Sequence, residues 1–148
     1  MSINTADFMR EFDKWVDDTK LAYDKALAAT ALDMFTGIVK LTPVDKGILR
    51  GNWQVQINSP ATTQTDSKSN PIPAASSILS KYRGGSIYFS NNKPYAMTAE
   101  YGLWGTGAGA TNKTTRDGYS VQAPYGMVRV TLENFTQTLK KNAEANKI

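Results

Sequence analysis

The feature that most restricts the fold of this chain is an amphipathic pattern that runs without interruption from residue 5 to about residue 40. This stretch contains no proline and one late glycine, and Asn4 or Thr5 can cap its start, while Pro43 ends it. Its apolar residues recur at spacings of three and four, apart from a gap around Thr19: Phe8, Phe12, Trp15, Val16, Tyr23, Leu27, Ala31, Met34, Ile38 and Leu41. The pattern predicts one long amphipathic helix.

A helix of this length has a direct consequence for a chain of 148 residues. The chain is long enough for one domain, residues 1–148, and the helix would be a rod of roughly 50 Å, longer than such a domain is wide. We therefore expect part of the helix to be bent, broken or packed on a neighbour. The aromatic residues near its start, Phe8, Phe12 and Trp15, can belong either to the core or to an intersubunit contact.

Two short segments predict a small sheet. The segment "NWQVQIN", residues 52–58, alternates Trp53, Val55 and Ile57 with glutamines, which is typical of a half-buried strand. A second strand is expected over Ser86–Ser90, and the segment "YSVQ" is a candidate for a last one.

The remaining segments predict loops and a C-terminal helix. Residues 59–80 are polar and small with three prolines, and residues 102–118 are rich in glycine, so both are expected to be long exposed loops. After Pro124 a helical pattern returns, with one apolar face made of Val128, Leu132, Phe135, Leu139 and Ala143. The predicted fold class is α+β: a long N-terminal helix and a C-terminal helix packed on a small, mainly antiparallel sheet, with long loops.

Composition argues against most enzyme classes. The chain has neither cysteine nor histidine, which removes thiolate nucleophiles, zinc-thiolate sites and the commonest general base. The glycine-rich run near residue 105 lacks the Gly-Lys-Ser/Thr ending of a phosphate-binding loop, and no cluster of carboxylates suits a metal. Asp45 and Glu100 could meet as an acid and base acting on a sugar, but Asp45 can instead bond the turn before Gly47 and Glu100 can pair with Arg50 or Arg83. We expect no catalytic, cofactor or metal site, and no enzyme activity.

Charge is distributed unevenly along the chain, whose net charge is +4. Residues 1–41 carry five basic and seven acidic residues, and the rest carries twelve basic and six acidic residues. This asymmetry suits head-to-tail self-association, an acidic partner or DNA. No cluster of Lys and Arg predicts sequence-specific DNA binding, and the aromatic residues interleaved with basic ones, Trp104 among them, favour a protein interface over a surface for stacking bases. With no signal peptide and no run of 18 apolar residues, the chain is expected to be made in a cytoplasm and to need no membrane.

Three segments resemble a known family. The segment "LTPVDKGILRGNWQV" is similar to the "TPVDTGxLRxxW" signature of the lambdoid-phage tail-component family, which comprises small neck or tail-completion proteins of tailed bacteriophages. The segment "GGSIYFSNNKPYAMTAEYG" resembles that family's strand, its "NNxPYA" turn and its "EYG" stretch, and "QAPYGMVRVTLENF" resembles its "APxGMVRxT" segment. Together the three segments cover about half of the chain and follow the family's order.

The resemblance implies a structural virion protein that forms a homo-oligomeric ring, a hexamer or dodecamer, at the head-tail junction and joins the head to the tail. Its partners would be further copies of itself and other neck, connector and tail proteins, against which the loops could become ordered, while genomic DNA would only pass through the lumen. A tail terminator or other tail-tube protein is an alternative, and a non-specific DNA-binding accessory protein is a more remote one. The protein would be found in the virion after assembly in the host cytoplasm.

The matched positions imply structural roles. Pro43, Asp45 and Gly47 would shape a corner after the long helix, and Trp53 would anchor the sheet. Arg50 has two open roles, an internal pair with Glu100 or a contact across a ring interface. The second segment would be built by Pro94, Tyr95, Glu100, Tyr101 and Gly102, and the interface candidates are Phe8, Phe12, Trp15 and Trp104.

Overall fold

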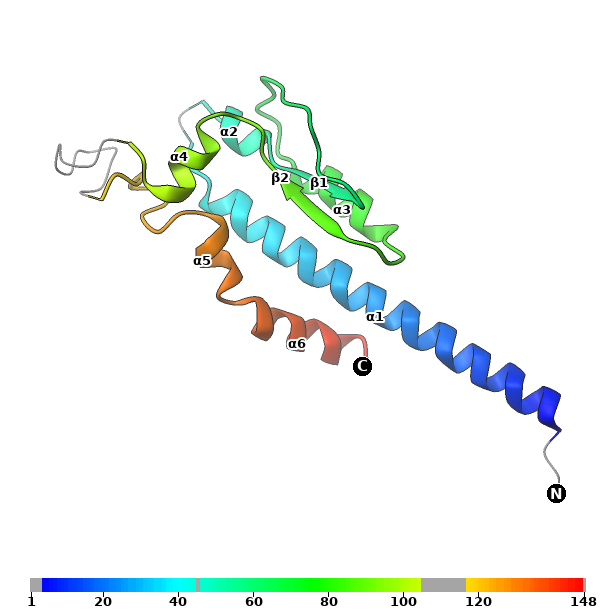
Figure 1. The fold of residues 1–148 in the computed structure, drawn as a ribbon. Helices are drawn as coiled ribbons and strands as arrows, with labels where there is room; N and C mark the ends of the chain where they lie inside the picture. The colour runs from blue at the N-terminus through cyan, green and yellow to red at the C-terminus, as the bar shows by residue number, and fades with distance from the viewer. Residues whose placement is uncertain (1–3, 45, 105–116, 148) are drawn as a thin grey trace.

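The computed structural model describes residues 4–44, 46–104 and 117–147 of the chain. It is an α+β fold with a long N-terminal helix, a two-stranded antiparallel sheet and C-terminal helices, which confirms the predicted fold class (Figure 1). The elements are α1 (Thr5–Leu41), α2 (Ile48–Gly51), β1 (Gln54–Ile57), α3 (Ile72–Ser80), β2 (Ile87–Ser90), α4 (Ala96–Tyr101), α5 (Val128–Leu132) and α6 (Phe135–Ala145).

Helix α1 is one unbroken helix of 37 residues, as the periodicity predicts. The side chain of Asn4 caps its start by accepting a hydrogen bond of 2.9 Å from the backbone N–H of Ala6. Its buried residues all lie from Ala26 onward, and the first half projects beyond the rest of the molecule (Figure 1). The helix is therefore neither bent nor broken (Figure 1). We call its projecting part, residues 5–24, the overhang.

The sheet covers one side of the second half of α1. Strands β1 and β2 pair antiparallel, with Val55 opposite Phe89 and Ile57 opposite Ile87. The ring of Phe89 meets the fully buried ring of Phe35, on α1, edge to face at 5.4 Å between centroids. This contact joins the sheet to the centre of the core.

The predicted loop over residues 59–80 is wrong in its last nine residues, because Ile72–Ser80 forms helix α3. Pro73 lies in its first turn, where its missing N–H costs nothing, and Ala75 and Leu79 are buried against α1 and β1. Residues 59–70 contain no helix or strand, and Ala61 among them is buried.

The C-terminal helical pattern is divided in two, because the chain turns at Glu133 and Asn134 between α5 and α6. Both helices pack on α1, on another side from the sheet (Figure 1). The predicted single apolar face is therefore not formed: Leu132 and Phe135 are 49% and 42% exposed. The buried contact of α6 is instead Asn142, whose amide donates to Thr30 at 3.2 Å and to Asp33 at 3.0 Å.

Two further predictions concern residues 102–122. Residues 119–122 form no strand of the sheet, so the last predicted strand is absent. The predicted loop over 102–118 falls mostly on residues 105–116, which lie outside the described residues.

Candidate functional site

The corner after α1 is built around the C-terminal end of that helix. Thr42 follows the helix, and Trp53 is buried with its indole N–H donating to the Thr42 hydroxyl at 2.7 Å. Gly47 has a φ of 83°, a left-handed conformation that glycine adopts without strain, and it precedes α2. Pro43 is half-buried in the turn, whereas Asp45 lies outside the described residues.

Arg50 interacts with the end of α1, and Glu100 with Arg129, so the internal Arg50–Glu100 pair, one of the two roles open for Arg50, is not formed. A contact of Arg50 across a ring interface stays a prediction. One guanidinium nitrogen donates to the carbonyl oxygens of Lys40 and Thr42, at 3.3 and 3.2 Å. The last carbonyls of a helix have no partner within the helix and carry its negative end, so a cation placed there stabilises it. Arg50 thus caps α1 from α2.

Replacing Arg50 with Met should lower the free energy of unfolding by about 1–2 kcal/mol, because the aliphatic volume stays while the hydrogen bonds to Lys40 and Thr42 are lost. Urea unfolding followed by circular dichroism measures the change. The exposed Lys46 is a matched control, since Lys46→Met should change stability by less than about 0.5 kcal/mol. Equal stability of Arg50→Met and the wild type would show that the cap contributes nothing.

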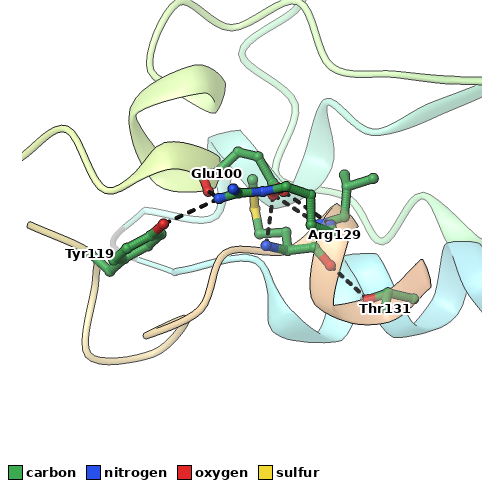
Figure 2. A network of polar contacts seen from close by, with 6 residues as sticks. Glu100, Tyr119, Arg129 and Thr131 are labelled. Atoms are coloured by element: carbon green, nitrogen blue, oxygen red, sulfur yellow. Dashed lines mark hydrogen bonds and ion pairs between the residues drawn. The ribbon is translucent and has the colours of Figure 1, made fainter. Parts of the chain in front are cut away.

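The second candidate site is a polar cluster between α4 and the start of α5, with Glu100 at its centre (Figure 2). One carboxylate oxygen of Glu100 accepts from the backbone N–H groups of Met127 and Val128, at 2.7 and 2.8 Å. The other accepts from the backbone N–H and from Nε of Arg129, both at 3.0 Å. We call these residues, with Tyr119, the Glu100 cluster.

Arg129 closes the cluster from the solvent side. Its guanidinium donates to the backbone carbonyl of Glu100 at 2.6 Å and to the Tyr119 hydroxyl at 3.1 Å (Figure 2). The guanidinium carbon also lies 4.5 Å from the centre of the Tyr101 ring. One side chain thus joins α4, α5 and the segment that carries Tyr119.

The ionisation of Glu100 reflects two opposed effects. Burial of its carboxylate raises its pKa, but the hydrogen bonds from Arg129, Val128 and Met127 together lower the pKa by more than burial raises it. The net pKa therefore lies below the ordinary value for glutamate. Hydrogen bonds to Tyr119 and Glu100 raise the pKa of Arg129. Glu100 is therefore a charged acceptor with both oxygens engaged, which suits a structural contact and not a general acid.

The other matched residues surround the Glu100 cluster. Pro94 and Tyr95 lie just before α4 and are exposed, and Gly102 ends α4 with a φ of 68°. A side chain at Gly102 would collide with the ring of Tyr119, at 2.5 Å. The sequence offered Arg50 and Arg83 as partners of Glu100, but its actual partner Arg129 could not be predicted, because the two are 29 residues apart and nothing in their spacing connects them.

The interface candidates are exposed. Phe8, Phe12 and Trp15 are 54%, 47% and 63% exposed on the overhang. The ring of Phe12 lies between the other two, 6.3 Å from the centroid of Phe8 and 6.0 Å from that of Trp15. They do not belong to the core, which removes one of the two interpretations of these residues. Trp104, 36% exposed, lies just after α4 and donates its backbone N–H to the carbonyl oxygen of Gly118.

The described residues contain no group of three or more acidic side chains placed to hold a metal ion. None of the described helices combines the length and apolarity needed to span a bilayer. The described part of the chain thus brings together a capped corner, an ion-pair cluster around the buried Glu100 and a row of exposed aromatic side chains.

Comparison with protein families identifies the class of protein to which the chain belongs. Residues 6–102, about two thirds of the chain, match the model of the HK97-gp10-like family, described as "Bacteriophage HK97-gp10, putative tail-component". The chain belongs to this family of bacteriophage tail components. No curated protein and no solved structure matches the chain significantly.

Proposed function

We propose that the protein is a non-enzymatic neck or tail-completion protein, which forms a homo-oligomeric ring at the head-tail junction of a tailed bacteriophage and joins the head to the tail. The observation that carries the proposal is the overhang of α1, where the aromatic side chains Phe8, Phe12 and Trp15 are 54%, 47% and 63% exposed. In a family of phage tail components, such a surface fits a subunit that becomes complete only in an assembly.

The residues matched by sequence divide into two roles under this proposal. Those of the corner and of the Glu100 cluster hold the subunit in shape, and the exposed Phe8, Phe12, Trp15 and Trp104 contact neighbouring chains. The partners are further copies and other neck, connector and tail proteins, with genomic DNA passing through the ring. The protein is then located in the virion, at the head-tail junction.

A phage whose gene for this chain is disrupted tests the proposal. Electron microscopy of the lysate should show filled heads and finished tails of normal length that are not joined, and supplying the chain from a plasmid should restore joined particles. Joined, infectious particles formed without the chain would refute it.

A second candidate is a tail terminator or another tail-tube protein, which the family's description as a tail component favours. The same lysate separates the two. Tails of uncontrolled or abnormal length would indicate a terminator, because a terminator stops growth of the tube, whereas normal unjoined tails indicate tail completion.

A further inference from the structure

The aromatic residues of the overhang continue a face of α1 that is covered further along the helix. Spacings of three and four run unbroken along this face: Phe8, Phe12, Trp15, Thr19, Tyr23, Ala26, Thr30, Asp33 and Gly37. Further along, α6 and α5 pack on α1: Ala26 and Thr30 are buried, Asn142 donates to Thr30, and Thr131 lies next to Gly37, while Asp33 stays about half exposed. The uncovered half therefore carries large aromatic side chains, and the covered half carries small ones.

The covered half also contains an open groove of about 400 Å³, where the chain turns between α5 and α6. Its lining mixes the apolar Met34, Leu41 and Val130 with polar and charged side chains. The residues that line the groove are Asp33, Met34, Gly37, Lys40, Leu41, Val130, Thr131, Asn134 and Thr138. We call it the α1–α5–α6 groove.

We propose that the overhang of one copy docks in the α1–α5–α6 groove of a second copy. The inference rests on the proposed ring and specifies how its subunits join. The overhang carries five large apolar side chains that are each about half exposed: Phe8, Met9, Phe12, Trp15 and Tyr23. Together they present on the order of 500 Å² of apolar surface, a large share of the roughly 800 Å² that each partner buries in a standard interface.

Charge favours this pairing over a symmetric one. Residues 5–24 carry three basic and six acidic residues, a net charge of −3, whereas residues 128–147 carry four basic and two acidic ones, a net charge of +2. Two overhangs placed side by side would bring two charges of −3 together, but an overhang on the C-terminal helices pairs opposite charges.

Geometry requires the contact to join different copies. The overhang and the groove lie on one continuous helix, with Phe12 and Asp33 about 30 Å apart along its axis, so a chain cannot place its overhang in its own groove. Each copy then offers one overhang and one groove, which is a heterologous interface. Interfaces of this kind repeat from copy to copy, and they close into a ring where the rotation between copies closes and extend into a filament where it does not.

Substitution of the aromatic residues tests the contact in the purified full chain. Replacing both Phe12 and Trp15 with Glu should raise the concentration at which half of the chain self-associates by at least about tenfold, as measured by sedimentation velocity. Met97, 61% exposed on α4, is a control of equal exposure, and Met97→Glu should leave that concentration unchanged. Self-association that is unaffected by the double substitution, or affected equally by Met97→Glu, would overturn the proposal.

Cysteine pairs identify the groove, because the chain has no cysteine of its own. Phe12→Cys and Asn134→Cys, made in separate chains, mixed and oxidised within assembled particles, should form a disulfide-linked dimer that neither variant forms alone. Ser80→Cys, exposed on α3 and away from the groove, should not link to Phe12→Cys.

The outcomes separate this inference from the proposed function. Particles that hold a ring of the chain but show no Phe12–Asn134 link, or show Phe12 linked to Phe12, would refute the docking while leaving the ring intact. Particles with no ring of the chain would refute the proposed function itself.

Discussion

Replacing Glu100 with Gln is expected to lower the free energy of unfolding by on the order of 3 kcal/mol at neutral pH. The carboxylate accepts four hydrogen bonds, from three backbone N–H groups and from Arg129, and it is nearly fully buried. A glutamine keeps one acceptor oxygen but turns an NH₂ group toward donors, and it leaves the guanidinium without its charged partner. Urea unfolding of the two proteins measures the loss.

The difference in unfolding free energy between the wild type and Glu100→Gln should also depend on pH. Because the pKa of folded Glu100 lies below its unfolded value of about 4.3, the ionised carboxylate stabilises the fold above that pH. The stabilisation falls as the pH drops through the lowered pKa of the folded state. The difference between the wild type and Glu100→Gln should therefore shrink on acidification, starting near pH 4.

Glu144, which is exposed on α6, is the matched control. Glu144→Gln should change stability by less than about 0.5 kcal/mol at neutral pH. A Glu100→Gln protein as stable as the wild type at pH 7 would show that the Glu100 cluster does not hold α4 to α5.

Replacing Phe35 with Ala is expected to lower the free energy of unfolding by about 3–5 kcal/mol. Phe35 has no exposed surface, and its ring meets Phe89 where α1, β1 and β2 come together, so its removal leaves a cavity and ends an aromatic contact. Thermal and urea unfolding measure the loss. Phe135→Ala removes a ring of the same size that is 42% exposed, and should cost less than about 1 kcal/mol in the monomer; equal costs at the two sites would contradict the assigned core.

The long helix and the two strands could be predicted from sequence because their signals are local. The apolar spacing of α1 and the alternation around Val55 depend on neighbouring residues, and packing reinforces both. Helix α3 was missed because proline and serine in "PIPAASSILS" indicate a loop. Its signal was present in Pro73 at a helix start and in the spacing of Ile72, Ala75 and Leu79.

The candidate site was less predictable because its contacts join distant segments. Arg50 caps α1 and does not pair with Glu100, whereas Glu100 binds Arg129, in a segment whose apolar pattern predicts only the start of a helix. Opposite charges alone do not select a partner among several candidates. Glu100 pairs with Arg129 because N–H groups at the start of α5 bind the same carboxylate. Those N–H groups converge on one point only once α5 has formed.

The straightness of α1 makes the overhang a lever. About twenty residues project from the part of the helix that the core holds, a length of roughly 30 Å. A tilt of about 10° where the helix leaves the core would move its tip by about 5 Å, close to one turn of a helix. The packing around Phe35 and Asn142 therefore sets not only the stability of the subunit but also the position of the aromatic side chains at its far end.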